Sequence, residues 1–137
     1  MECNEILEDG LGRLGLALDE AKVEALCVYF AELSKWNRKM NLVAHAAAQQ
    51  VLEAHFLDSL TLLPFLRATD VQKKLLDVGS GAGFPGLVLK TVLPELEVTL
   101  IEPRQKRVSF LKHIIRTLGL KGVEVLAIRL DKNPIIS

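Results

Sequence analysis

A glycine-rich segment in the middle of the chain has the residue types and spacing of a ligand-binding turn. Its sequence, between two apolar stretches, is Asp77-Val78-Gly79-Ser80-Gly81-Ala82-Gly83-Phe84-Pro85-Gly86. Glycines in such a turn let the backbone bend sharply and approach a ligand without Cβ atoms in the way. Pro85 suits the first turn of a following helix. Residues 79–86, called the glycine loop below, are therefore predicted to join a strand to a helix and to bind a ligand.

Two carboxylates accompany the glycine loop. Asp77 comes two residues before its first glycine, and Glu102 follows a second apolar stretch, nineteen residues after Gly83. A carboxylate with the spacing of Glu102 can accept hydrogen bonds from both hydroxyls of a ribose. A charge at Asp77 would repel an anionic pyrophosphate but attract a ligand that carries a sulfonium and an ammonium group. The pair therefore favours S-adenosylmethionine (SAM) as the cofactor.

Other interpretations of the same residues remain open. The spacing Gly81-x-Gly83-x-x-Gly86 also fits the dinucleotide fingerprint, so an NAD-binding oxidoreductase is one alternative. A small-molecule SAM methyltransferase and a non-catalytic module that binds RNA or protein are two more. A tight structural turn with incidental acids would give the same local pattern.

The patterns around the loop predict helices first and a parallel sheet after them. Apolar residues spaced by three and four predict a helix over 22–40 with Asp19 as its N-cap, and a second helix runs from about 47 to 63, limited by Pro64. The predicted strands and helices that follow are 74–78, 86–93, 97–101, 105–118 and 123–128. Their alternation predicts right-handed crossovers and half of a doubly wound α/β fold. We expect a helical section, residues 1–70, joined near 69–73 to a Rossmann-like section, residues 71–137.

The net charge of zero hides an asymmetry along the chain. Residues 1–33 carry eight acids and two bases, whereas residues 34–137 carry nine acids and fifteen bases. The basic part could face a polyanion such as RNA, or could simply be a solvated surface. The candidate RNA-binding residues are Lys35 and Arg38 around Trp36, and Arg104, Lys106 and Arg107.

The remaining composition points to a cytoplasmic protein. The chain has only two cysteines, without zinc-like spacing, an acidic N-terminus unlike a signal peptide, and no apolar stretch long enough for a membrane span. No membrane partner is therefore expected. His55 and Asp58 share one helical face and could contact a substrate or each other, but they are too few for a metal site.

Taken together, these motifs resemble the glucose-inhibited division protein B (GidB, RsmG) family of ribosomal RNA methyltransferases. The resemblance covers about residues 20–127. It is carried by residues 77–86, by Glu102 with Lys106-Arg107-Val108-x-Phe110-Leu111 after it, and by Asn41-Leu42 and His55-x-x-Asp58-Ser59. It implies a class I SAM-dependent methyltransferase fold, and an enzyme that transfers a methyl group to N7 of a guanine in small-subunit (16S) ribosomal RNA.

The resemblance also extends the set of expected cofactor contacts. It places Leu130 and Asp131 beside the adenine, although this chain reads Ile128-Arg129-Leu130-Asp131 where the family usually reads Gly-Arg-Ala-Glu. The full set of candidate cofactor-binding residues is Asp77, Gly79, Ser80, Gly81, Gly83, Phe84, Glu102, Leu130 and Asp131. The N7 lone pair of guanine is nucleophilic at neutral pH, so no catalytic base is expected, and the sequence assigns no catalytic residue.

The family's sheet has strand order 3-2-1-4-5-7-6, of which this sequence supplies three strands. The first strand would then have a free edge, which is prone to pair with another chain. We therefore expect a C-terminally truncated member that binds SAM weakly, methylates little or nothing, and self-associates through that edge.

Overall fold

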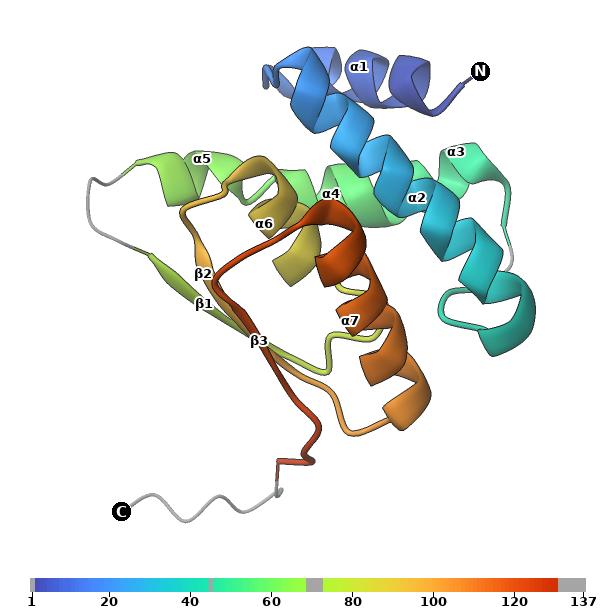
Figure 1. Ribbon diagram of the computed structural model, residues 1–137. Coiled ribbons are helices and arrows are strands. Elements are labelled where there is room, and N and C mark those ends of the chain that lie inside the picture. Colours follow the sequence, from blue (N-terminus) through green and yellow to red (C-terminus); the bar gives the residue numbers. More distant parts are fainter. Residues whose placement is uncertain (1, 45, 69–72, 131–137) are drawn as a thin grey trace.

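In the computed structural model the helices come first and the sheet follows (Figure 1). The structure describes residues 2–44, 46–68 and 73–130. The elements are α1 (Cys3–Leu14), α2 (Glu20–Met40), α3 (Ala48–Val51), the π-helix η1 (Leu52–Leu57), α4 (Asp58–Leu60), α5 (Leu63–Arg67), β1 (Lys74–Val78), α6 (Gly86–Val92), β2 (Glu97–Ile101), α7 (Gln105–Leu118) and β3 (Val123–Leu126).

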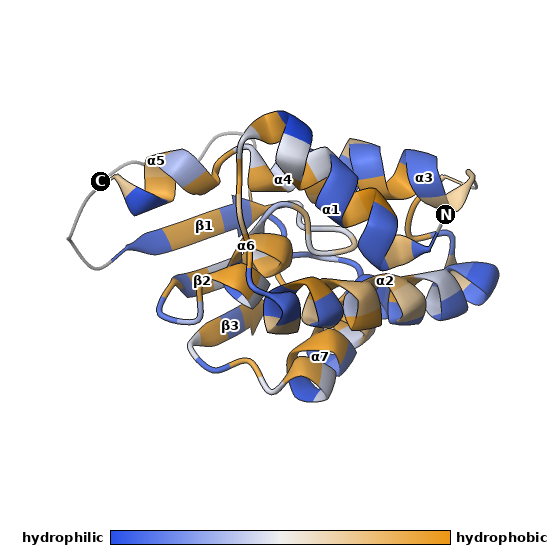
Figure 2. Ribbon diagram, turned by 90° about the horizontal axis from the view of Figure 1, so that it is seen from above, coloured by the Kyte–Doolittle hydropathy of each residue, from blue (hydrophilic) through white to orange (hydrophobic). Residues whose placement is uncertain are grey.

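The strands form a parallel sheet with the order β1-β2-β3, which confirms the expected α/β class. Figure 2 shows the three strands side by side, with α6 and α7 along them. Both crossovers proceed in the same direction across the sheet, so their right-handedness puts α6 and α7 over one face. The last strand ends at Leu126, two residues earlier than expected.

Helix α6 lies at the centre of the molecule. It contacts β1 and β2 on one side and α2 and α4 on the other. All seven of its residues are buried, including Lys90, whose Nζ donates to the carbonyl of Leu96 at 2.6 Å. Because α2 and α4 cover the face of α6 that would otherwise meet solvent, this helix has no exposed side.

The helical section follows the sequence expectations in α2 and departs from them after it. Asp19 caps α2 as predicted, accepting from the amide of Lys22 at 2.9 Å. The second predicted helix is instead divided, with η1 in its middle and a turn at residues 61 and 62. Pro64 does not end that helix but lies in the first turn of α5, where its missing N–H removes no helical hydrogen bond.

One hydrophobic core joins the two sections. It extends from Ile6 and Leu7 in α1, through α2 and η1, to Leu100 in β2 and Ile114 in α7. The joint expected near residues 69–73 falls mostly outside the described residues. Of the helices in the described part of the chain, none has both the length and the apolar character needed to cross a membrane.

Candidate functional site

The glycine loop begins at the carboxyl end of β1 and is tied to the neighbouring strand. The amide of Gly79 donates to the carbonyl of Ile101 in β2 at 2.8 Å. The amide of Gly83 donates to the carbonyl of Ser80, also at 2.8 Å, and closes the turn. The Ser80 hydroxyl donates to the carbonyl of Asp77 at 3.0 Å and is buried. The side chain of Ser80 therefore stabilises the turn from inside.

Glu102 lies directly after β2 and faces the loop. Its Oε1 accepts from the amide of Gly81 at 3.0 Å, and its Oε2 accepts from the amide of Arg104 at 2.9 Å. The residue is only 2% exposed. The structure thus brings Glu102 to the glycine loop, as the spacing predicted, and shows that it also holds the loop in place.

Asp77 is buried at the start of α6. Its Oδ2 accepts from the amide of Gly86 at 3.0 Å, so the carboxylate occupies the N-terminal end of that helix. Burial raises the pKa of Asp77, against the opposing effect of the hydrogen bonds from Gly86 and Ser80. A Cβ on Gly86 would lie 2.9 Å from Oδ2, which explains why a glycine is required there. The carboxylate therefore lies in a site that favours its neutral form or a cationic neighbour.

A tyrosine from the helical section also contacts the loop. Tyr29 in α2 is fully buried, and its hydroxyl donates to the carbonyl of Ala82 at 2.5 Å. Gly83 has φ +99°, and a Cβ there would lie 2.2 Å from this hydroxyl oxygen. The close approach of Tyr29 and the positive φ both require glycine at this position.

The sequence of the chain is similar to proteins of one family. The family model described as "rRNA small subunit methyltransferase G" (GidB) matches residues 22–136. The chain belongs to this family. Relatives named ribosomal RNA small subunit methyltransferase G occur in Desulfotalea psychrophila (48% identical, covering 93% of this chain and 58% of the relative), Geobacter sp. strain M21 (40%, 93% and 57%) and Myxococcus xanthus (50%, 76% and 46%). The chain thus spans about half the length of the curated relatives it matches.

Two of the candidate substrate-binding residues lie beside the loop of this GidB-family chain. The imidazole of His55 in η1 stacks on Phe84, with ring centroids 4.8 Å apart and planes within 6°. Arg107 in α7 approaches from another element, its guanidinium 3.6 Å from where a Cβ on Gly81 would be. The π-helix is a rare conformation often found at functional sites, and here it carries His55 to the loop.

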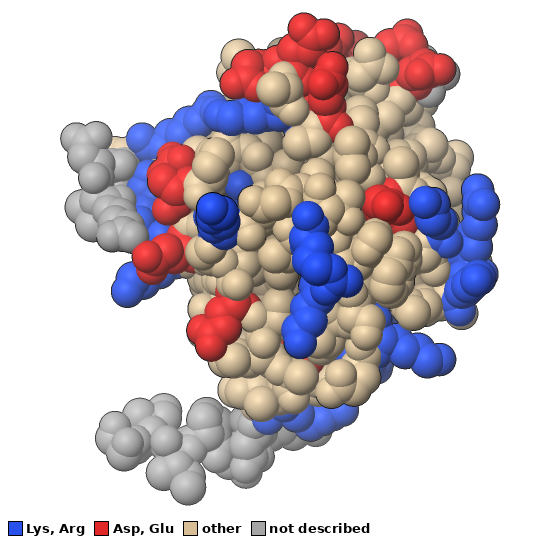
Figure 3. All heavy atoms as spheres, in the orientation of Figure 1, with Lys and Arg blue, Asp and Glu red and all other residues tan. Residues whose placement is uncertain are grey.

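The other basic candidates lie on the surface. Arg104 and Lys106 are exposed near the start of α7, and Lys35 and Arg38 are exposed on α2. The ammonium group of Lys35 lies 3.3 Å from the Glu32 carboxylate. Trp36, between Lys35 and Arg38 in the sequence, packs against Phe110 with ring centroids 5.5 Å apart. Figure 3 shows the acidic side chains gathered over α1 and basic ones lower on the right, over the end of α2. On this face the acidic N-terminal residues therefore form a cluster, whereas the basic residues are more widely spread.

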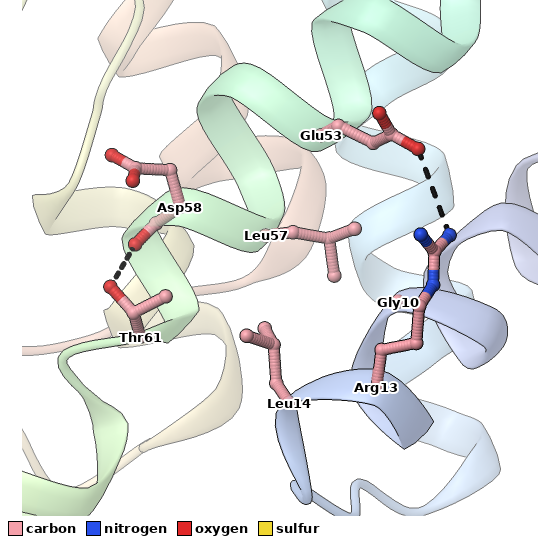
Figure 4. A pocket seen from close by; sticks show the side chains of 7 residues that line it. All are labelled: Gly10, Arg13, Leu14, Glu53, Leu57, Asp58 and Thr61. Atoms are coloured by element: carbon pink, nitrogen blue, oxygen red, sulfur yellow. Dashed lines mark hydrogen bonds and ion pairs between the residues drawn. The ribbon is translucent and has the colours of Figure 1, made fainter.

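Two hollows border the segment that carries His55 and Asp58. One, of about 300 Å³, lies beside the glycine loop and is lined in part by His55, Asp58 and Phe84. The other, of about 250 Å³, lies between α1 and the η1–α4 segment (Figure 4). There Arg13 points toward Glu53 at 3.8 Å, and Leu57 faces Gly10. Asp58 is exposed and borders both hollows.

Leu130 and Asp131, the adenine-binding residues implied by the resemblance, have no described contact with the glycine loop. Leu130 is 49% exposed, and Asp131 lies outside the described residues. Tyr29, by contrast, was absent from the sequence-based candidates. A usable signal existed, because Tyr29 lies on the buried side of α2 with Leu26 and Leu33, and a buried tyrosine hydroxyl usually has a hydrogen-bond partner.

Proposed function

We propose that the glycine loop binds SAM and that the chain provides the cofactor site of a methyltransferase acting on ribosomal RNA. The observation that carries this proposal is the position of Asp77. In dinucleotide-binding folds a pyrophosphate occupies the N-terminal end of the helix after the loop. Here the Asp77 carboxylate already accepts from the Gly86 amide at that end. A pyrophosphate would meet a carboxylate, whereas the positive groups of SAM would be attracted to it.

Glu102 fits the ribose of the same ligand. Each carboxylate oxygen accepts one main-chain N–H, and each keeps a second lone pair that can accept a sugar hydroxyl. We assign the remaining cofactor contacts to the main chain at Gly79, Gly81 and Gly83 and to the ring of Phe84. Leu130 and Asp131 stay assigned to the adenine by the resemblance alone.

Bound SAM supplies a methyl group on a positively charged sulfur. A guanine N7 needs no base to attack it, so the protein's part is to hold the two reactants in line. The rings of His55 and Phe84 stack beside a hollow that Asp58 also lines. Aromatic rings at such a place could stack on a flat nucleobase. We assign contacts with RNA phosphates to Arg107, Arg104, Lys106, Lys35 and Arg38.

The basic residues also favour RNA over a small-molecule methyl acceptor. They lie on α2 and on α7 with its N-cap Arg104, and the two helices pack against each other. A small acceptor would need no such surface. The relatives are named as methyltransferases of small-subunit ribosomal RNA, and we propose the same substrate, with guanine N7 as acceptor and the cytoplasm as location, for the protein to which this chain corresponds.

Calorimetry and thermal denaturation with SAM and with NAD test the proposal. We expect SAM to bind and to raise the melting temperature, since a ligand that binds only the folded state stabilises it. NAD should do neither. Stabilisation by NAD without a response to SAM would overturn the assignment, and a chain that binds ribosomal RNA with no response to either cofactor would point to a non-catalytic module.

A further inference from the structure

Tyr29 is placed to control the shape of the glycine loop from outside the sheet. Its ring lies among three phenylalanines, 5.1 Å from Phe56, 6.1 Å from Phe84 and 6.4 Å from Phe110 between centroids. Packing on several sides leaves the phenol little freedom to rotate. Burial, with a smaller contribution from Asp77, raises the pKa of Tyr29 well above its ordinary value, so the hydroxyl stays protonated and remains a donor.

The peptide that Tyr29 contacts is held at both ends. The carbonyl of Ala82 accepts from the Tyr29 hydroxyl, and the amide of Gly83 in the same peptide group donates to the carbonyl of Ser80. These two bonds fix the plane of the Ala82–Gly83 peptide. Glycine at position 83 has φ +99° and could adopt several other backbone conformations. Among the described residues, removal of the tyrosine hydroxyl would leave this peptide the hydrogen bond to Ser80 and the packing of Ala82 in the core.

We propose that Tyr29 is a positioning residue that fixes the Ala82–Gly83 peptide, so that the glycine loop is preformed for its ligand. The inference rests on the proposed function, because the ligand is taken to be SAM. It assigns to the helical section a role in cofactor affinity. A loop that must order on binding has a lower affinity than a preformed one, since part of the interaction energy is used to restrict it.

The variant Tyr29→Phe removes only the hydroxyl oxygen and keeps the ring packing. We expect its Kd for SAM, measured by calorimetry, to rise by about tenfold, which corresponds to about 1.4 kcal/mol. Hydrogen–deuterium exchange of residues 79–86, measured without any ligand, should become faster. The exchange measurement reports on the peptide whether or not SAM binds.

Ile6→Val is the matched control. Ile6 is buried in α1, and the loss of one methyl group from its side chain lowers the stability without removing either hydrogen bond of the Ala82–Gly83 peptide. At a temperature where both variants are folded, it should keep the wild-type Kd and the wild-type exchange of residues 79–86. A general loss of stability would instead move both variants alike.

The outcomes separate this inference from the proposed function. Unchanged loop exchange in Tyr29→Phe would overturn the positioning role, and so would faster exchange with an unchanged Kd for SAM. If the wild-type chain bound no SAM, the proposed function would be overturned. The exchange data would still decide whether Tyr29 holds the Ala82–Gly83 peptide.

Discussion

At the scale of single residues, the candidate site consists of carboxylates whose hydrogen bonds go to the main chain. Asp77 accepts from Gly86, and Glu102 accepts from Gly81 and Arg104. Such contacts hold the loop in shape before any ligand arrives. They also place negative charge in a buried region, which opposes folding at neutral pH unless a cation or a donor compensates it.

The charge of Asp77 is expected to oppose folding but to attract SAM, and the variant Asp77→Asn tests both effects. Its amide oxygen can still accept from Gly86, but it carries no charge. The raised pKa of Asp77 means that its contribution to stability is complete below the ordinary value of 3.8 and is lost as the pH rises through the folded-state pKa. We therefore expect Asp77→Asn to melt higher than wild type at neutral pH, with a difference that shrinks toward acidic pH.

The same variant should bind SAM at least about tenfold more weakly, a loss of about 1.4 kcal/mol, because the attraction to the positive ligand is gone. Calorimetry and melting curves at several pH values measure both effects. Glu124→Gln, which removes one charge from an exposed position on β3, serves as the control and should change neither quantity appreciably. Full retention of SAM affinity in Asp77→Asn would contradict the role given to this carboxylate.

The residues of the loop could be predicted from the sequence because their spacing is local. Glycines, a carboxylate before them and a carboxylate after the next strand are all read within 26 residues, from Asp77 to Glu102. Tyr29 could not be assigned in the same way. Its bond to Ala82 joins residues 53 positions apart, and nothing in the helical pattern of α2 names the partner. The inward direction of the Ser80 hydroxyl likewise depends on the folded turn.

At the scale of elements, the contact between α1 and η1 depends on a missing side chain. Gly10 is buried against Leu57, and the two helices approach each other closely there. Gly12, two residues later in the same helix, is exposed, and a Cβ added to it would meet no heavy atom within 4 Å. The two glycines therefore provide a matched pair of sites, one closed by packing and the other open to solvent.

Gly10→Ala should lower the stability or leave it unchanged, whereas Gly12→Ala should raise it. Gly10→Ala overpacks the contact at a cost of about 1–3 kcal/mol, partly offset by about 1 kcal/mol from the better helix propensity of alanine. Gly12→Ala keeps only the gain, about 0.5–1 kcal/mol. Urea denaturation of the two variants measures the difference in the free energy of unfolding. Equal stabilisation of both would show that α1 does not pack on η1 as described.

The elements differ in how far the sequence determined them. The helix α2 was predicted within two residues of its start because a capping aspartate and a regular apolar stripe act together. The division of the next helix was not predicted, since η1 differs from an α-helix in hydrogen bonding and not in composition. Pro64 was interpreted as the end of a helix, although proline is equally suited to the first turn of one.

At the scale of the whole molecule, one side of the sheet lacks the cover that the other has. Asp77 faces α6, so side-chain alternation turns Leu76 and Val78 toward the opposite face, where they are 59% and 55% exposed. Within the described residues, β1 pairs with β2 alone. The strand therefore presents free main-chain groups and apolar side chains together. The parallel sheet was predicted from the alternation and the order of its strands was implied by the family resemblance, but the single core shared with the helices was not predicted.

We expect a second copy of the chain to pair along β1. Analytical ultracentrifugation over a range of concentrations should show reversible self-association. Leu76→Lys should weaken it, because charge on an edge strand opposes pairing, while changing stability by only about 0.5 kcal/mol. Val28→Lys, an equally drastic change at an exposed position on α2, should leave association unaltered. A chain that stayed monomeric at high concentration would contradict this expectation.

The bond between Tyr29 and Ala82 also has a consequence for biosynthesis. Ribosomes make the chain from its N-terminus, so the tyrosine is added 53 residues before the alanine whose carbonyl it contacts. When the turn emerges from the exit tunnel, the helix on which it docks has already been translated. The nascent turn can therefore meet this partner before Ile101 and Glu102, which also hold the loop, have been synthesised.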